Sequence, residues 1–171
     1  DGDQQPWPAI RAGAPGFVQA IDVRTLRIDA IAPAGDPVDA GLLVPGALVG
    51  LLALDPATRR RLRFNGRVVA HDRGGLVLEA DQVFSNCPKY IQRRDEAPAV
   101  EAGTPATIAT APGLTDAQRT RLAAADTFFI ASARPGDGVD VSHRGGMPGF
   151  LQVDGTRLTW PDYGGNAMFN T

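Results

Sequence analysis

A serine and an arginine two residues apart, followed at once by two glycines, form the stretch of this sequence best suited to chemistry. Ser142 and Arg144 share one face if residues 139–144 form a regular strand, because side chains alternate across a strand. A guanidinium offers a charged fork, a hydroxyl offers another donor, and backbone N–H groups near Gly145 and Gly146 add more. The pattern is typical of a phosphate site, although a surface arginine beside a structural bulge fits it too.

Two aromatic residues flank a rigid Pro-Asp step further along the chain. Trp160 and Tyr163 lie on either side of Pro161 and Asp162. Such a segment can lie against a flat ring system. The alternative is the end of a strand whose aromatic side chains belong to the core.

A third candidate is the arginine-rich strand expected over residues 60–71. Arg61 and Arg63 project from one face of it, and further arginines lie nearby at Arg59, Arg60 and Arg67. Such a cluster can recognise a phosphate or a carboxylate. A charged face exposed to solvent explains the pattern equally well.

Lys89 follows Cys87 and Pro88 near the expected start of a short helix over residues 88–93. Free amides and the helix dipole favour anions there, and they could also make Cys87 a reactive thiolate. A structural cap and a buried single cysteine are the alternative.

Neither metal nor nucleophile chemistry has a recognisable pattern in this chain. The only histidines, His71 and His143, lie far apart, and His143 falls on the valine face of its strand, where we expect it to be packed. A single cysteine excludes a disulfide framework and a cysteine-rich zinc site. No known metalloprotease, nucleotide-binding or hydrolase motif occurs.

Composition describes an ordinary globular chain of 171 residues with 43% hydrophobic and 21% charged residues. The net charge of −2 is not that of a nucleic-acid-binding protein. The longest apolar run, residues 42–54, is interrupted by Pro45 and Gly46 and is too short to cross a membrane. We therefore expect a cytoplasmic protein that acts on a small molecule, without nucleic-acid or membrane partners.

Short strands dominate the expected structure. They are predicted at residues 17–21, 25–28, 47–54, 60–71, 76–84, 128–133, 139–144 and 157–160. The continuously apolar strand at 47–54 is typical of one buried on both faces. Short helices are predicted at residues 38–44, 88–93 and 115–125, the last opened by a Thr-x-x-Gln capping box. The pattern indicates a mainly β fold, a β-barrel with short helices.

One nine-residue motif occurs twice. It reads RAGAPGFVQ at residues 11–19 and RGGMPGFLQ at residues 144–152, and six of the nine positions are identical. We interpret this as two tandem copies of one folding unit. The first copy spans residues 1–94, with a degenerate front half whose start is missing. A linker follows at 95–113, and residues 114–171 hold only the front half of the second copy, so we expect the chain to be part of a longer protein.

The chain resembles the FMN-binding split barrels related to pyridoxamine 5′-phosphate oxidase. The resemblance rests on an ordered set of motifs, DVSHRGGMPGF and LTWPDYGGN with LVGLLALD, RRRLRFNGRV and QVFSNCPKYIQRR. It covers nearly all of the chain except the linker. It implies a split β-barrel, usually dimeric, with FMN in a cleft between two barrels. Together with the repeated motif, this predicts a duplicated split barrel.

Matching the motifs residue by residue gives the implied FMN contacts: Ser142, Arg144, Trp160, Pro161, Asp162, Tyr163, Asn166, Arg61, Arg63 and Lys89. Ser142 and Arg144 match the strand that meets the phosphate, and residues 160–163 match the segment along the flavin. Arg61 stands where the oxidase has glutamine. The substrate-binding signature of the oxidase is not recognisable, so its substrate is not expected here.

The two copies differ in what they retain. In the first, Ala9 and Ile10 replace Ser142 and His143, and residues 29–31 replace the Pro-Asp-Tyr step. Its back half keeps the arginine strand and Lys89. We therefore expect either a homodimer or an internal pseudo-dimer with one competent cleft, formed by the front of copy two and the back of copy one.

The expected function is that of an FMN-dependent oxidoreductase of unknown substrate, with no catalytic side chain identified. Two alternatives stay open. One is a non-enzymatic split barrel that binds flavin, haem or a deazaflavin, and the other is a degenerate barrel with a structural or partner-binding role.

Overall fold

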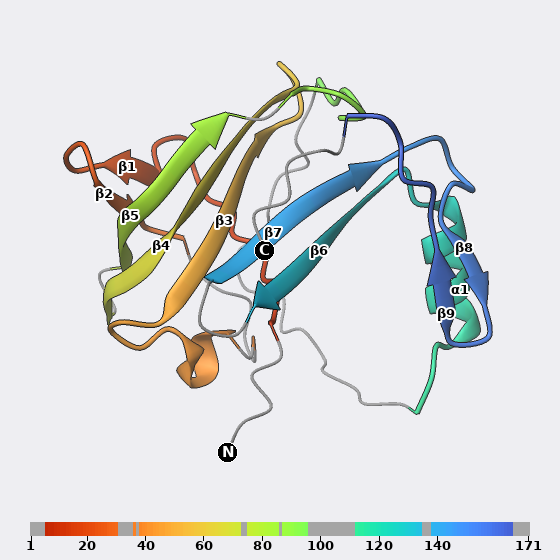
Figure 1. Cartoon of the computed structure of the whole chain (residues 1–171), viewed down its shortest axis with the longest axis horizontal. Coiled ribbons are helices and arrows are strands. Elements are labelled where there is room, and N and C mark those ends of the chain that lie inside the picture. The colour runs from red at the N-terminus through yellow and green to blue at the C-terminus, as the bar shows by residue number, and fades with distance from the viewer. Residues whose placement is uncertain are drawn as a thin grey trace.

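The protein is mainly β, with antiparallel sheets and few helices (Figure 1). The computed structural model describes residues 6–30, 36, 38–72, 75–85, 87–95, 112–134 and 138–165. The strands in these ranges form three separate sheets of five, two and two strands, rather than one closed barrel. The predicted mainly β class is thus confirmed.

The largest sheet has the order β1-β2-β5-β4-β3, and every neighbouring pair is antiparallel. Its strands are β1 (Val18–Ala20), β2 (Thr25–Ile28), β3 (Leu48–Asp55), β4 (Arg60–Asp72) and β5 (Gly75–Ser85). Strands β4 and β5 form the long predicted hairpin. Their register shifts between Asn65 and Gly66, where the glycine predicts a bulge, and again between Val68 and Ala70.

The hydrophobic core lies on one face of this sheet. Alternating residues of β5 are buried as predicted, because side chains at every second position share a face. The buried cluster consists of Ile28, Phe64, Val68, Leu76, Leu78 and Ala80. Strand β3 differs from its prediction, since its residues are at most half-buried and Leu48 is 44% exposed. The expectation that it is buried on both faces is wrong.

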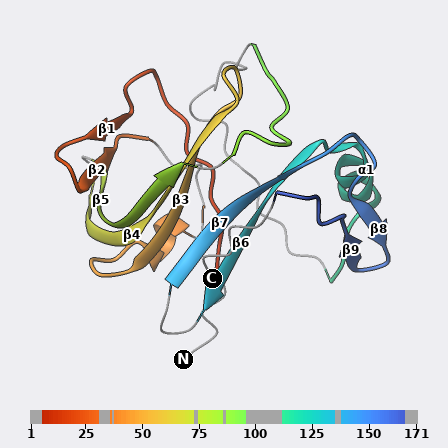
Figure 2. The same cartoon turned by 45° about the horizontal axis from the view of Figure 1, so that its top comes forward.

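The C-terminal part consists of two hairpins and a helix. Strands β6 (Thr127–Arg134) and β7 (Gly138–Gly145) form the first hairpin, and β8 (Gln152–Asp154) and β9 (Arg157–Thr159) form the second. Helix α1 (Asp116–Ala124) packs beside β8 and begins with the predicted capping box at Thr115. In both views of the ribbon, β7 runs alongside β3, so the first hairpin adjoins the large sheet (Figures 1 and 2).

A glycine permits this approach of β7 to β3. A Cβ atom on Gly50 would lie 2.7 Å from the Cα atom of Asp140 and 2.8 Å from the carbonyl oxygen of Val139. Real Cβ atoms do not come that close to backbone, so only glycine fits here. The backbones of β3 and β7 therefore touch at this point.

Of the helices predicted at residues 38–44 and 88–93, the first contains a short helical turn and the second is absent. Residues 38–44 contain the short π-helical turn η1 (Val38–Leu42), whose first amide donates to the Asp36 carboxylate at 2.9 Å. Residues 88–93 are not helical, which corrects the prediction. Tyr90 adopts a left-handed backbone with φ of 65°, and a left-handed residue ends any right-handed helix.

The repeated motif folds in the same way in both places. The amide of Phe17 donates to the carbonyl of Ala14 at 3.0 Å, and the amide of Phe150 donates to that of Met147 at 2.9 Å. The equivalent glycines, Gly16 and Gly149, have φ values of 92° and 89°. Sequence likeness at residues 11–19 and 144–152 thus corresponds to one local structure.

Candidate functional site

The arginine strand and the serine strand meet at a buried ion pair. The Arg63 side chain is 5% exposed, and its Nη1 lies 3.0 Å from Oδ2 of Asp140 on β7. Its Nη2 donates to the Ser142 hydroxyl at 3.0 Å and to the Val141 carbonyl at 3.2 Å. Arg63 therefore connects β4 to β7, and its charge is balanced by a carboxylate.

The pKa values of Arg63 and Asp140 are affected both by burial and by the attraction between the two groups. Burial lowers the pKa of Arg63 and raises that of Asp140, since both charged forms lose solvation. The attraction between the two groups acts against each shift. Replacing both members of such a buried pair by apolar residues is often neutral, whereas removing one member is strongly destabilising.

Two further arginines lie at this junction without a carboxylate. Arg61 and Arg144 are both partly buried, and in the described part of the chain neither forms an ion pair. Burial lowers the pKa of Arg61, and the positive charges of Arg63 and Arg144 lower it further, while Cys87 opposes them. The junction therefore carries uncompensated positive charge in a partly desolvated place, which favours an anion.

His143 lies between these arginines. It is 2% exposed, its Nδ1 lies 3.4 Å from Nη1 of Arg61, and its carbonyl accepts from Nη1 of Arg144 at 3.2 Å. Its ring contacts Phe129 edge-on, with centroids 5.7 Å apart. Burial lowers the pKa of His143 to about 4, helped by the charges of Arg61 and Arg144, so the ring is neutral at neutral pH.

Buried nitrogen atoms at the junction have no hydrogen-bond partner in the described residues. They include Nε of Arg61 and Nε2 of His143. Buried polar groups are nearly always hydrogen-bonded, so these atoms are candidates to contact water or a bound polar group. In the described contacts the Ser142 hydroxyl accepts from Arg63, which leaves its own hydrogen to donate.

Residues 87–92 pack against the far end of β7. The left-handed Tyr90 places its hydroxyl 2.9 Å from the Gly164 carbonyl, to which it donates, and its ring stacks on Tyr163 with centroids 5.0 Å apart. Gln92 donates to the Gly146 carbonyl at 2.9 Å. These contacts join the Cys-Pro-Lys segment to the glycines that follow Arg144.

Lys89 lies against the Gly-Gly step beyond Tyr163. A Cβ atom on Gly165 would come within 2.9 Å of the Lys89 Cδ atom. The aliphatic part of the lysine thus covers this glycine, while the residue as a whole stays exposed. Lys89 and Tyr163 are therefore neighbours at one end of the junction.

The structure brings together most of the residues predicted to bind cofactor. Arg61, Arg63, Ser142 and Arg144 lie at the junction of β4 and β7, and Lys89 and Tyr163 lie at its end. Trp160 instead packs edge-on against Phe128, with centroids 5.1 Å apart, and Phe128 is the cross-strand partner of Arg144. Pro161 and Asp162 are exposed, and Asn166 lies outside the described residues.

Several residues of the site were not found from the sequence. Asp140 shares the alternation of Ser142 and Arg144, so its place on that face was foreseeable, but its pairing with Arg63 was not. His143 was expected to be packed, which is confirmed, yet its position between two arginines has no local signature. Tyr90 and Gln92 likewise act through contacts with distant glycines.

The buried histidine predicts a pH dependence of stability. The unfolded chain has the ordinary histidine pKa of 6.5 and the folded chain about 4, so the unfolded state binds more protons between these values. The contribution of His143 is therefore complete above pH 6.5 and is lost as the pH falls towards 4. The loss amounts to about 3 kcal/mol, since each pKa unit corresponds to about 1.4 kcal/mol.

Urea unfolding at pH 7 and pH 4 measures this dependence. The stability difference between the two pH values should shrink in His143→Gln and stay as in the unaltered protein in His71→Gln, which alters an exposed position. The same pH dependence in both variants would contradict the assignment.

The described residues contain no group of three His, Cys, Asp or Glu side chains arranged to hold a metal ion. Among the described helices, none combines the length and apolar character needed to cross a bilayer. Comparisons of the chain with protein-family models, curated proteins and solved structures found no match.

Proposed function

We propose that this protein binds FMN at the junction of β4 and β7 and acts as an FMN-dependent oxidoreductase. Its substrate would be a small molecule of unknown identity. The proposal combines the sequence resemblance to split barrels with the grouping of arginine, serine and aromatic side chains at one place. Bound FMN would supply the hydride or electron transfer, and the protein would supply position and electrostatics.

The observation that carries the proposal is the pair of arginines without a carboxylate. Arg61 and Arg144 would hold the phosphate, because a guanidinium binds a phosphate through charge-assisted and often bidentate hydrogen bonds. The Ser142 hydroxyl would donate a further bond. Arg63 would act indirectly, since its charge is balanced by Asp140 and its contacts place Ser142.

The aromatic and lysine side chains at the end of β7 suit the rest of the cofactor. Tyr163 is stacked on Tyr90, so a flat ring would meet a surface that is already ordered. Lys89 would add positive charge beside it. The neutral His143 would offer a hydrogen bond without further charge repulsion.

The first copy of the repeat lacks an equivalent site. Arg11 occupies the position of Arg144 in that copy, but it lies 3.9 Å from the Asp36 carboxylate, with both side chains largely buried. Ala9 and Ile10 stand in place of Ser142 and His143. This supports a single cleft, formed by the back half of copy one and the front half of copy two.

The visible spectrum of the protein, recorded before and after addition of FMN, tests the proposal. We expect the flavin bands to stay with the protein through gel filtration and to bleach when NAD(P)H is added. Stable flavin that no donor reduces would indicate a binding or storage protein. Absence of flavin uptake would overturn the assignment of the site.

A further inference from the structure

The two hairpins that follow the repeated turn differ in their surroundings. Hairpin β1–β2 belongs to the large sheet, because β2 pairs along its whole length with β5. Hairpin β8–β9 forms a sheet of its own, and among the described residues β9 pairs only with β8. Within the described part of the chain, one edge of β9 is therefore unpaired, whereas the equivalent edge of β2 pairs with β5.

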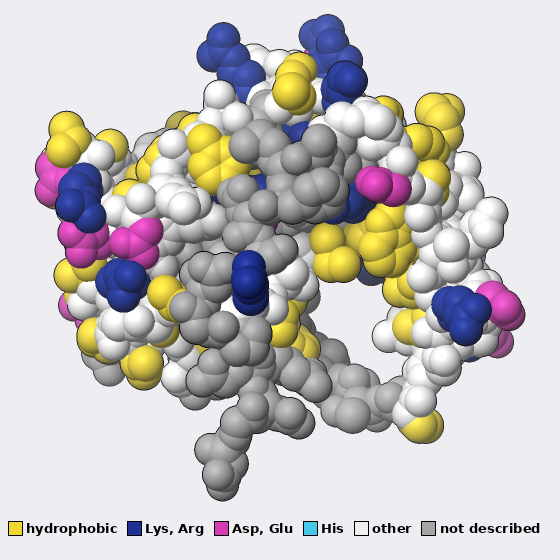
Figure 3. Space-filling model, viewed as in Figure 1, with side chains coloured by type: hydrophobic (Ala, Val, Ile, Leu, Met, Phe, Trp, Pro, Cys, Tyr) yellow, Lys and Arg dark blue, Asp and Glu magenta, His cyan; other side chains and the backbone are white. Residues whose placement is uncertain are grey.

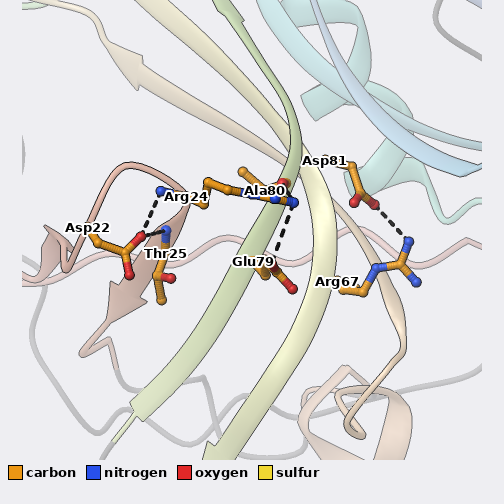
Figure 4. Close-up of polar contacts among 7 residues, drawn as sticks. All are labelled: Asp22, Arg24, Thr25, Arg67, Glu79, Ala80 and Asp81. Atoms are coloured by element: carbon orange, nitrogen blue, oxygen red, sulfur yellow. Dashed lines mark hydrogen bonds and ion pairs between the residues drawn. The ribbon is translucent and has the colours of Figure 1, made fainter.

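In the first hairpin, Arg24 contacts the neighbouring strand β5 (Figure 4). The amide of Ala80 donates to the carbonyl of Arg24 at 2.8 Å, and Nη2 of Arg24 donates back to the carbonyl of Ala80 at 3.3 Å. The same guanidinium lies 3.5 Å from the Glu79 carboxylate. The arginine that precedes β2 thus contacts both the backbone and an acidic side chain of β5.

The second hairpin carries an arginine at the position that Thr25 has in the first. Arg157 immediately precedes Leu158, as Thr25 immediately precedes Leu26. Thr25 is the cross-strand partner of Glu79 on β5. The side chain of Arg157 is exposed and has no hydrogen bond or ion pair with another residue that the structure describes. A strand paired with β9 as β5 pairs with β2 would therefore place its glutamate opposite Arg157.

The apolar residue of the hairpin is repeated. Leu26 lies opposite Ala20, and Leu158 lies opposite Val153, the residue equivalent to Ala20. Leu26 packs against the hydrophobic core, whereas Leu158 is 39% exposed. In the first copy this leucine is covered because β2 is joined to β5.

The unpaired edge of β9 faces a gap in the molecule. Both ribbon views place β9 on the side of its hairpin that is turned towards β6 (Figures 1 and 2). The space-filling view shows an open gap at this place, between the part formed by α1, β8 and β9 and the rest of the molecule (Figure 3). A strand added to β9 would lie in this gap.

We propose that the free edge of β9 binds an extended peptide strand of the same chemistry as β5. The strand runs antiparallel to β9, alternates leucine-like residues with polar ones, and places a carboxylate opposite Arg157. Open strand edges pair readily with such segments through their main-chain groups, and side-chain pockets select among them.

A second copy of the chain is a poorer occupant of this edge. Two three-residue strands paired with each other would bury far less than the roughly 1,200 Å² of a stable interface. Pairing centred on Leu158 would also place Arg157 opposite Thr159, where no carboxylate is available. The acidic strand satisfies the arginine, and the self-paired edge does not.

The test uses a labelled peptide with the sequence of residues 75–82, GLVLEADQ, and the whole protein. We expect saturable binding by fluorescence anisotropy and slowed amide exchange at residues 157–159. Leu158→Asp should lower the affinity at least about tenfold, because it places a charge on the apolar contact. Val23→Asp, at a residue 98% exposed in the other hairpin, should leave it unchanged.

Reversing the charges of the peptide glutamate and of Arg157 distinguishes the proposed register from nonspecific binding. A peptide carrying lysine in place of its glutamate should bind weakly to the unaltered protein and regain affinity for Arg157→Glu. Absence of binding, equal binding of both peptides to both proteins, or exchange protection at residues 25–28 instead of 157–159 would each overturn the proposal. None of these outcomes depends on FMN.

Discussion

Arg144→Ala is expected to abolish retention of FMN, while Arg11→Ala leaves it intact. The two arginines occupy the same position of the repeated motif, so they form a matched pair. Arg144 has no carboxylate partner among the described residues, whereas Arg11 lies 3.9 Å from Asp36. Removing a charge-assisted contact of about 1.5–3 kcal/mol lowers affinity roughly 10- to 150-fold.

Flavin fluorescence quenching measures this effect, and riboflavin provides the control because it lacks the phosphate. Arg144→Ala should reduce the affinity for FMN strongly and that for riboflavin much less. Arg61→Ala should behave in the same way as Arg144→Ala. Equal losses in Arg144→Ala and Arg11→Ala would rule out a single cleft, and equal losses for FMN and riboflavin would show that Arg144 does not bind the phosphate.

Asp140→Ala is expected to destabilise the protein by about 3–5 kcal/mol, since it leaves the buried Arg63 charge without a partner. Asp140 and Arg63 side chains are 4% and 5% exposed, so water cannot replace the lost carboxylate. The matched control is Asp81→Ala, which removes the partner of Arg67 at the same distance of 3.0 Å in an exposed pair. Exposed pairs contribute about 0–1 kcal/mol, so this variant should stay close to the unaltered protein.

Urea unfolding of these variants and of the double variant Arg63→Met with Asp140→Leu completes the experiment. The double variant should recover most of the stability, because it removes both buried charges and keeps apolar volume. It should nevertheless weaken FMN binding, since Ser142 loses the contact that positions it. Equal destabilisation by Asp140→Ala and Asp81→Ala would show that the Arg63–Asp140 pair is not buried in solution.

Local patterns determined much of this fold. The alternation of leucines in β5, the bulge at Gly66 and the capping box at Thr115 all depend on residues close together in the chain, and the structure contains each of them. The repeated turn belongs to the same group. Its glycine with positive φ and its short hydrogen bond are properties of nine consecutive residues, so the sequence likeness was enough to predict a shared geometry.

Long-range packing decided the rest. The predicted helix at residues 88–93 is absent because Tyr90 takes a left-handed conformation, in which its ring and hydroxyl contact Tyr163 and Gly164. Burial of β3 on both faces was inferred from its apolar run alone. In the structure β3 is the edge strand of the large sheet, and the backbone of β7 touches it at Gly50.

The candidate site depends both on local sequence and on long-range packing. The residue types were visible in the sequence, because guanidinium, hydroxyl and glycine are the groups that bind phosphate. Which arginines lack a carboxylate partner was not visible in the sequence. Arg63 and Asp140 lie 77 positions apart in the chain, and they meet only because β4 packs against β7. Sequence alone determines the available chemical groups, and the tertiary structure decides which charges are neutralised, because a buried charge takes its partner from whatever strand packs beside it.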